Sequence, residues 1–359
     1  IGDQFATKYR FRHILFQRYL YGRLAAADRL LLHERTGRTL EALYRESADP
    51  PVVDLAHHFD RAGLVEPAIA YLQRAGQRAF RMAANEEVLR LIQRALDLLP
   101  SLPESPERDR YELELLVALS ASAMAVRGYT APESDQIGHR VRDLCHHLEP
   151  SPTAALALFG LGQVLTVQAR HSEARAVSRD VLATGRALDD SGVEMVGHYG
   201  LGYLGVWMGN LSAGWRNLQR TCRLYDPEEH AWLTHALGMA LGPEALVWAA
   251  VCGLHCGRPE QAFGMADEGI AVARKLEHPF TLCHALGIGG SALRIMAGDY
   301  ETANRFAEEA AAIAEEEHFP FWVWSLAIQR GVIEGYLGDP DEGASTVRSG
   351  LDAWHEMGV

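Results

Sequence analysis

Gly298-DYET-Ala303 is a short turn that begins with a glycine and has a small residue five positions later. The same arrangement, with a small residue at both ends, recurs along the chain. Its other copies are Gly63-LVEP-Ala68, Ala169-RHSE-Ala174, Gly209-NLSA-Gly214, Gly257-RPEQ-Ala262 and Gly338-DPDE-Gly343. The first residues of the last five copies are 40, 48, 41 and 40 residues apart. A nearly fixed period of this length predicts a solenoid of stacked repeats.

Each of these turns suits the junction of two antiparallel helices. A glycine just beyond the first helix adopts the left-handed conformation at little cost. An Asp, Asn or Pro then begins the second helix, as at Asp299, Asn210 and Pro259. The small residue five positions after the glycine lets the second helix pack closely on the first. Because a single hairpin leaves an apolar face uncovered, neighbouring hairpins must stack.

Apolar residues follow helical spacing almost throughout, as at Leu89, Ile92, Leu96 and Leu99, and no convincing strand pattern of alternating β-branched residues occurs. We therefore predict an all-α chain that ends in an α-solenoid of stacked helical hairpins. The predicted hairpins lie near Gly63, Ala83, Ala169, Gly209, Gly257, Gly298 and Gly338.

The turns resemble tetratricopeptide (TPR) repeats in the residues that flank them. A TPR has a large apolar residue followed by a small one eight and seven positions before the turn, as in Leu161-Gly162 and Leu201-Gly202. Gly290-Ser291 and Arg330-Gly331 lack the large residue. The period also exceeds the usual TPR length of about 34 residues. The resemblance implies a right-handed, TPR-like α-solenoid, and the longer period implies longer helices or longer turns between repeats.

A second resemblance covers most of the chain. It begins with Tyr9-Arg-Phe-Arg-His-Ile-Leu-Phe-Gln17, Tyr21 and Leu32-His33. The later blocks are Ala56-His-His-Phe59, Ala68-Ile-Ala-Tyr-Leu-Gln-Arg-Ala-Gly76, Arg127-Gly-Tyr-Thr-Ala-Pro-Glu133, Leu224-Tyr-Asp-Pro227 with His230, His278-Pro-Phe280 and Phe319-Pro-Phe-Trp322. Together they resemble the TPR-like C-terminal region of bacterial signalling ATPases of the STAND/AAA type. Those proteins often carry a class III adenylate or guanylate cyclase or a LuxR-type helix-turn-helix domain. Leu241-Gly-Pro-Glu244 departs from the Asp-Pro-Gly turn that is usual there.

This resemblance implies a piece of a longer signal-transduction protein. Residues 1–48 would be the tail of a winged-helix or helical module that follows the ATP-binding core, and residues 49–359 would be the solenoid. ATP and magnesium would bind only in other domains of the parent, because this chain has no G-x-x-x-x-G-K-[ST] motif and only two lysines. Gly287-Ile-Gly-Gly-Ser-Ala292 follows no strand and is interpreted as helix packing rather than as a dinucleotide motif.

The composition disfavours several other classes of function. A formal net charge of −13 argues against a nucleic-acid partner, which requires a basic face. Five cysteines without regular spacing indicate a reducing, cytoplasmic compartment. Residues 236–254 are apolar enough to raise the question of a membrane span, but Pro243 and Glu244 interrupt them. We therefore expect a buried helix pair there and no membrane partner.

The chain contains two groups of cysteine and histidine residues that could be considered as metal ligands. Cys145-His146-His147 is compact, but adjacent helical residues point in different directions. Cys252 and Cys256 share a helix face, with His255 beside them and no identifiable fourth ligand for zinc. We predict buried cysteines and no metal. His230 is expected to cap a helix or to bond a neighbouring loop.

The candidate interaction surface is the inner groove, which first helices line in TPR solenoids. Offsets from each turn place mainly apolar and aromatic residues there, without a basic clamp. The candidate ligand or partner residues are Phe159, Gln163, Tyr199, Tyr203, Trp207, Glu244, His255, Met296 and Tyr336. The alternative is that a tighter superhelix buries these positions as core. Trp322, Trp324 and Phe321 are expected to be core between repeats.

The leading functional hypothesis is a non-catalytic regulatory solenoid that binds a protein partner or other domains of its own parent. A second hypothesis is a receptor for a small apolar ligand, with Tyr199, Tyr203 and Trp207 as anchors. A third is an enzyme that uses His230, His235 and Glu244 as acid and base, although nothing in their spacing indicates catalysis. A scaffold that forms a homodimer is a further alternative.

Overall fold

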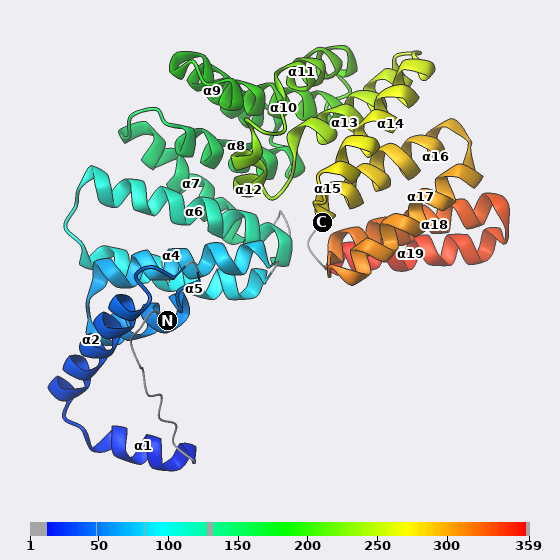
Figure 1. Cartoon of the computed structure of the whole chain (residues 1–359). Coiled ribbons are helices and arrows are strands. Elements are labelled where there is room, and N and C mark those ends of the chain that lie inside the picture. The colour runs from blue at the N-terminus through cyan, green and yellow to red at the C-terminus, as the bar shows by residue number, and fades with distance from the viewer. Residues whose placement is uncertain (1–12, 48, 83, 128–131, 357–359) are drawn as a thin grey trace. The chain divides into compact units, whose positions relative to one another are not determined.

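The computed structural model describes residues 13–47, 49–82, 84–127 and 132–356, without the side chains of residues 81, 121, 124–127 and 132–134. These residues form helices and turns and no strand, which confirms the all-α prediction. Two compact units, residues 1–119 and 120–359, divide the chain and are described separately (Figure 1). The division falls within one helix and leaves the predicted boundary after residue 48 untested. The predicted turn at Ala83 lies outside the described residues.

The first unit contains the first predicted repeat. Its helices are α1 (Ile14–Arg23), α2 (Ala26–Leu43), α3 (Val52–Ala62), α4 (Val65–Arg81), α5 (Asn85–Leu98), the short 3-10 turn η1 (Leu99–Ser101) and the first part of α6 (Pro106–Arg127). α3 and α4 form a hairpin around Gly63, and the ring of Phe59 stacks on Tyr71 at 5.5 Å. Gly37 brings α2 against Phe59, because a Cβ there would lie 3.1 Å from the ring. α1 buries none of its side chains.

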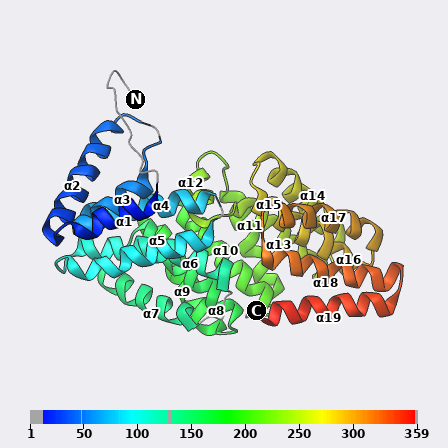
Figure 2. The same ribbon diagram turned by 90° about the horizontal axis from the view of Figure 1, so that it is seen from below.

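The second unit is a succession of hairpins. It contains α7 (Pro132–His147), α8 (Pro152–Val167), α9 (His171–Leu188), α10 (Ser191–Trp207), α11 (Leu211–Leu224), α12 (Ala231–Leu237), α13 (Leu241–His255), α14 (Pro259–Lys275), α15 (Pro279–His284), the π-helical segment η2 (Ala285–Ala292), α16 (Leu293–Ala297), α17 (Tyr300–Glu316), α18 (Pro320–Leu337) and α19 (Pro340–Glu356). Helix α12 is inserted between two hairpins, which explains the single 48-residue spacing. Figure 2 shows the last hairpin, α18 with α19, as two antiparallel helices side by side.

The predicted turns have the expected backbone at five of the six positions. Gly63, Gly209, Gly257 and Gly298 have φ between 68 and 79°, and Ala169 adopts the same left-handed region at φ 58° although it carries a Cβ. Gly338 is the exception, with φ −132°, so the prediction of a left-handed residue there is wrong. At Gly338 the Glu334 carboxylate accepts the Asp339 N–H at 3.1 Å, which supports a different turn.

Small residues bring the two helices of a hairpin together, as predicted. A Cβ added to Gly205 on α10 would lie 2.8 Å from the Cα of Gly214 on α11. Asp299 caps the second helix α17 as predicted, since its side chain accepts the N–H of Thr302. Close backbone approach and capping together fix the hairpin geometry.

First helices of successive hairpins pack on one another as well as on second helices. We use "first helices" for α8, α10, α13, α15–η2–α16 and α18, and "second helices" for α9, α11, α14, α17 and α19. α8 contacts α10, α10 contacts α13, α13 contacts η2, and η2 contacts α18. Each of α9, α11, α14 and α17 packs between two consecutive first helices. The first helices therefore form a continuous row through the second unit.

The apolar segment at residues 236–254 forms two helices rather than one span. α12 and α13 meet at 76°, and α13 is buried along most of its length. The prediction of a helix pair is therefore confirmed. By length and composition, one continuous helix, Pro279–Ala297, is apolar enough to cross a membrane, and 61% of it is buried inside the protein. Burial of this kind is typical of a core helix.

Candidate functional site

The first helices of the second unit carry a chain of aromatic rings in mutual contact, which we call the aromatic row. Ring centroids lie 6.0 Å apart between Phe159 and Tyr199, 6.1 Å between Tyr199 and Tyr203, and 5.3 Å between Tyr203 and Trp248. Trp248 continues to His284 at 5.8 Å. Its members are Phe159, Tyr199, Tyr203, Trp207, Trp248, His284 and Trp322.

Helical spacing explains the part of the row that lies on α10. Tyr199, Tyr203 and Trp207 are successive i, i+4 positions, so their side chains share one face of the helix. The rings of Tyr199 and Tyr203 are nearly parallel at 6°, and Trp207 meets Tyr203 edge-on at 6.0 Å. Each such aromatic pair contributes about 0.5–1.5 kcal/mol beyond its buried area. The row is therefore a stable feature rather than a loose set of side chains.

A buried carboxylate lies beside the row. Glu244 is 1% exposed, and its Oε2 lies 2.8 Å from Nδ1 of His284, without the alignment of a hydrogen bond. Its other oxygen, Oε1, has no hydrogen-bond partner among the described residues, and neither has Nε1 of Trp248. Glu244 and Trp248 are i, i+4 on α13, so an unused acceptor and an unused donor lie on the same face.

Unpartnered polar atoms in a core are costly. A buried donor or acceptor without a partner costs about 1–3 kcal/mol, and a charged group costs more. Burial and the nearby Glu244 carboxylate raise the pKa of the Cys283 thiol to about 12. A ligand or partner group that forms hydrogen bonds with the unpartnered atoms of Glu244 and Trp248 would remove this cost. These two residues are therefore the candidate polar contacts of the row.

A second buried charge in this part of the fold is fully satisfied. Arg294 donates to the carbonyls of Gly289 and Gly290 at 2.6 and 3.3 Å and to Asp267 at 2.5 Å. It also lies over the rings of Phe263 and Phe306. The carbonyls belong to η2, where the π-helical turns shift the backbone. Arg294 therefore has a structural role. Trp322 packs where Gly287 has no side chain, which confirms the predicted packing role of that glycine-rich stretch.

Burial of the predicted groove residues follows their distance from the turn. Phe159, Tyr199 and Glu244, ten or thirteen residues before their turns, are buried. Gln163 and Tyr203, six residues before theirs, are half-buried. The four residues two positions before their turns are exposed, namely Trp207, His255, Met296 and Tyr336. The row brings together Phe159, Tyr199, Tyr203 and Trp207 and places Glu244 beside it.

The remaining exposed candidates have separate surroundings. Tyr336 stacks on Tyr300 at 4.2 Å, and Nδ1 of His255 bonds the carbonyl of Val251 at 2.9 Å. Trp248 and His284 belong to the row but are not among the predicted groove residues. Of the three aromatic residues predicted as core, Trp322 is buried, at 3% exposed, and Phe321 and Trp324 are half-buried. The signal that would have found Trp248 is its i, i+4 spacing from Glu244.

The other sequence candidates have ordinary roles. Nδ1 of His230 accepts the N–H of Asp226 at 3.0 Å, which confirms the predicted bond to a neighbouring loop. Glu244 pairs with His284 and not with the histidines of the enzyme hypothesis. Among the described residues, no group of three or more His, Cys, Asp or Glu is placed to hold a metal ion. Burial raises the pKa of Cys252 to about 12, whereas Cys256 is exposed. The prediction of buried cysteines is therefore confirmed at Cys252 and wrong at Cys256.

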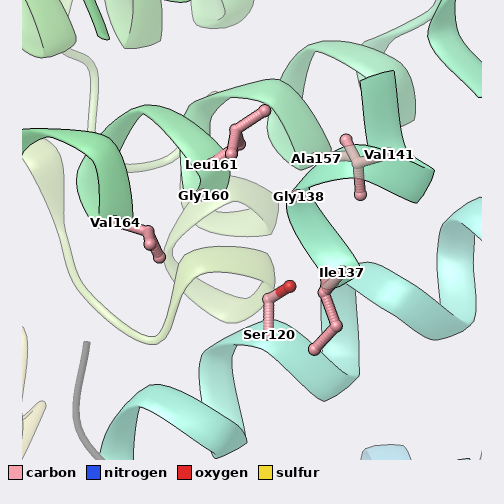
Figure 3. Close-up of a pocket in the computed structure, with 8 residues that line it drawn as sticks. All are labelled: Ser120, Ile137, Gly138, Val141, Ala157, Gly160, Leu161 and Val164. Atoms are coloured by element: carbon pink, nitrogen blue, oxygen red, sulfur yellow. The ribbon is translucent and has the colours of Figure 1, made fainter. Parts of the chain in front are cut away.

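A small cavity lies where α6, α7 and α8 meet in the second unit. It has a volume of about 10 Å³, enough for roughly one water. Figure 3 shows the apolar side chains around it, with Ser120 contributing a hydroxyl. We interpret it as a packing gap. An open hollow of about 770 Å³ in the first unit is lined by charged residues, including Arg94, which pairs with Asp60 at 2.7 Å.

Comparison of the sequence with known proteins does not assign the chain to a family. No protein-family model matches the chain. A stretch of 125 residues is 30% identical to an uncharacterised protein of Rhizobium meliloti (strain 1021), and it covers 35% of this chain and 12% of that protein. The chain thus spans only a small part of the length of this curated relative.

Solved structures align over nearly the whole chain. The Rap conjugation gene regulator of plasmid pLS20, in complex with the Phr* peptide, has a TM-score of 0.60 and 14% identity, covering 92% of this chain and 93% of that one. A Rap protein complexed with competence and sporulation factor has a TM-score of 0.61 and 12% identity, covering 96% and 98%. A STAND protein with a TPR sensor from Pyrococcus horikoshii has a TM-score of 0.47 and 15% identity, covering 94% and 48%. The Rap structures establish a TPR-like α-solenoid fold.

Proposed function

We propose that this chain is a non-catalytic regulatory solenoid whose aromatic row binds a peptide segment of a protein partner. The observation that carries the proposal is the row itself, which crosses α8, α10, α13, α15 and α18 beside a buried carboxylate with an unused oxygen. Aromatic side chains supply large apolar contact area at interfaces. A partner segment would contact Tyr203 and Trp207 first, since these rings are half-buried and exposed.

Two polar atoms suit a peptide behind those rings. Oε1 of Glu244 can accept from an N–H or an ammonium group, and Nε1 of Trp248 can donate to a carbonyl. Both atoms are covered, so rings of the row must shift for a ligand to reach them. The Rap regulators, which share this fold, were solved with a peptide and with competence and sporulation factor. Their complexes favour a peptide over the small apolar ligand of the alternative hypothesis.

A displayed library of short random peptides, selected on the purified chain, tests the proposal. We expect selected peptides to bind at least about tenfold more weakly to Trp207→Ala, a loss of about 1.4 kcal/mol. Tyr336→Ala is the matched control, because both rings are exposed and lie two residues before a turn glycine. Equal binding to both variants contradicts the proposal. A library that yields no binder, together with stabilisation by an apolar metabolite, supports the small-molecule receptor instead.

We further propose that the solenoid is the sensor of a STAND-type signalling ATPase, with ATP and magnesium bound in other domains. The sequence blocks along the chain support this parentage, as does the much longer curated relative. Residues 1–48 would then follow the ATP-binding module. A thermal-shift measurement with Mg·ATP tests whether nucleotide binds this chain or only other domains, since a nucleotide that binds the folded chain raises its Tm. We expect no shift, and binding at micromolar nucleotide contradicts the proposal.

A further inference from the structure

A second groove lies between α9, α10 and α11, away from the aromatic row. It has a volume of about 280 Å³. Its lining combines an apolar floor with basic and amide side chains and contains no acidic residue; among its members are Arg175, Arg179, Leu201, Leu204, Met208 and Asn217. We call it the basic groove.

Helix α10 separates the two surfaces. Its residues Leu201, Leu204 and Gly205 line the basic groove, whereas Tyr199, Tyr203 and Trp207 belong to the aromatic row. Leu201 follows Tyr199 by two positions, which is about 200° around an α-helix. The basic groove is therefore a different face of the same helix, and its occupant need not touch the row.

Neither arginine of the groove forms an ion pair with a described residue. Nη2 of Arg175 contacts the sulfur of Met208 at 2.9 Å, and Arg179 is exposed. By contrast, Arg170, just before the same helix, is paired with Glu173 at 2.8 Å and with Asp135 at 2.9 Å. The two groove arginines are i, i+4 on α9, so they present a pair of charges along one edge.

Helix α11 contributes Ala213 and Asn217 to the groove and carries further positive charge. It contains Arg216, Arg220 and Arg223 and no acidic residue. All three are exposed, and none forms an ion pair among the described residues. In the described part of a chain with a formal net charge of −13, the two helices that pack on α10 at the groove thus carry five arginines that form no ion pair. Such local charge attracts an acidic ligand and accelerates its association.

The apolar floor of the groove, beside its arginines, favours an amphipathic ligand. Leu201, Leu204 and Met208 offer apolar contact between the arginines of α9 and Asn217 of α11. Asn217 is held in place, with Oδ1 3.0 Å from Nδ1 of His198 and Nδ2 donating to the carbonyl of Ala213 at 3.0 Å. A nucleic-acid backbone would use the arginines but not the apolar floor, and the net negative charge of the chain opposes it.

We propose that the basic groove docks an acidic, amphipathic helix of a protein partner, with its apolar face on α10 and its carboxylates toward Arg175 and Arg179 of α9. Helix-in-groove recognition of this kind uses anchors at i, i+3 and i+4 positions. The proposal is independent of peptide binding at the aromatic row.

Fluorescence anisotropy tests the proposal with a labelled helical peptide that carries leucine on one face and glutamate on the other. Arg175→Glu/Arg179→Glu should weaken binding by at least about tenfold, and Arg175→Gln/Arg179→Gln by less. Arg330→Glu/Arg348→Glu is the matched control, because it reverses two exposed arginines elsewhere in the second unit that form no ion pair with a described residue. Binding should also weaken as salt is raised.

Three results would overturn the proposal. One is equal weakening by the control pair, which would indicate general charge attraction rather than a groove. Another is tighter binding of duplex DNA than of the peptide through the same arginines. The third is self-association of the chain that Arg175→Glu/Arg179→Glu abolishes, since the occupant would then be a second copy. Trp207→Ala should leave peptide binding at the basic groove unchanged, which separates this site from the aromatic row.

Discussion

Nδ1 of His284 lies 2.8 Å from Oε2 of Glu244, in a core where the other oxygen of that carboxylate has no partner among the described residues. The two residues come from neighbouring repeats, on α15 and α13. Their contact therefore joins two hairpins through the row of first helices. A polar link of this kind is weak evidence for stability, because removal from water offsets much of the attraction.

Removing the His284 side chain should lower the stability of the fold more than neutralising the Glu244 carboxylate. We expect His284→Ala to lower the free energy of unfolding by about 3 kcal/mol, since it leaves a buried carboxylate uncompensated and a gap beside Trp248. Glu244→Gln keeps the shape and removes the charge, so its cost should be below about 1 kcal/mol. Urea denaturation of both variants and of the double variant measures the coupling. Additive effects in the double variant would show that the pair does not interact.

Ala169 and Gly257 occupy equivalent turns with different residues. Both are left-handed, at φ 58° and 74°. Ala169→Gly should raise the free energy of unfolding by about 0.5 kcal/mol, because relief of strain exceeds the added freedom of the unfolded chain. Gly257→Ala should lower it by about 1 kcal/mol. Urea midpoints that move in the same direction for both variants would contradict this account of the turns.

Gly205 tests the close approach of the two helices of a hairpin. A Cβ there would lie 2.8 Å from the Cα of Gly214 and 2.9 Å from its nitrogen, so backbone must move. We expect Gly205→Ala to cost about 1–3 kcal/mol of stability. Gly160→Ala is the control within a first helix, since nothing lies within 4 Å of its added Cβ. It should be neutral or stabilising by up to about 1 kcal/mol, and thermal unfolding compares the two.

The hairpins were predictable because their signals are local. A glycine and a small residue five positions later act on the same turn, and Gly209-NLSA-Gly214 folds as expected. Gly338 was not predictable in this way, because a side chain, Glu334, supports the turn at that position. The pattern of residue types at a turn does not reveal which neighbouring side chain bonds the backbone.

The aromatic row was only partly predictable. Tyr199, Tyr203 and Trp207 share one helix, so spacing alone brings them together. Trp248, His284 and Trp322 join from three other helices, at positions nine, fourteen and sixteen residues before their turns. The π-helical turns of η2 change the rotation of the backbone between His284 and Gly298, so a fixed offset fails there. The basic groove was missed because it depends on which charges remain unpaired.

Two histidines join α2 to α3 in the first unit and should make this contact pH-dependent. Nδ1 of His33 lies 2.9 Å from Nδ1 of His58, and Nε2 of His33 lies 2.9 Å from the hydroxyl of Tyr21. Burial, followed by the neighbouring His58, His57 and Arg61, lowers the pKa of His33. Burial and His57 likewise lower the pKa of His58, against the opposing charge of Asp54.

The sign of the effect follows from these directions. Since both pKa values are lower in the folded state, the unfolded segment binds more protons below its ordinary histidine pKa of about 6.5. The contact of α2 with α3 should therefore be fully stable above that pH and weaken as the pH falls through it. Hydrogen exchange of the α2 amides, corrected for intrinsic rates, should show less protection at about pH 5.5 than at about pH 7.5. His33→Gln/His58→Gln should remove most of this difference, whereas His146→Gln, at an exposed position on α7, should retain it. Equal protection of α2 at both pH values in the unmodified chain would show that the histidine pair does not control this contact.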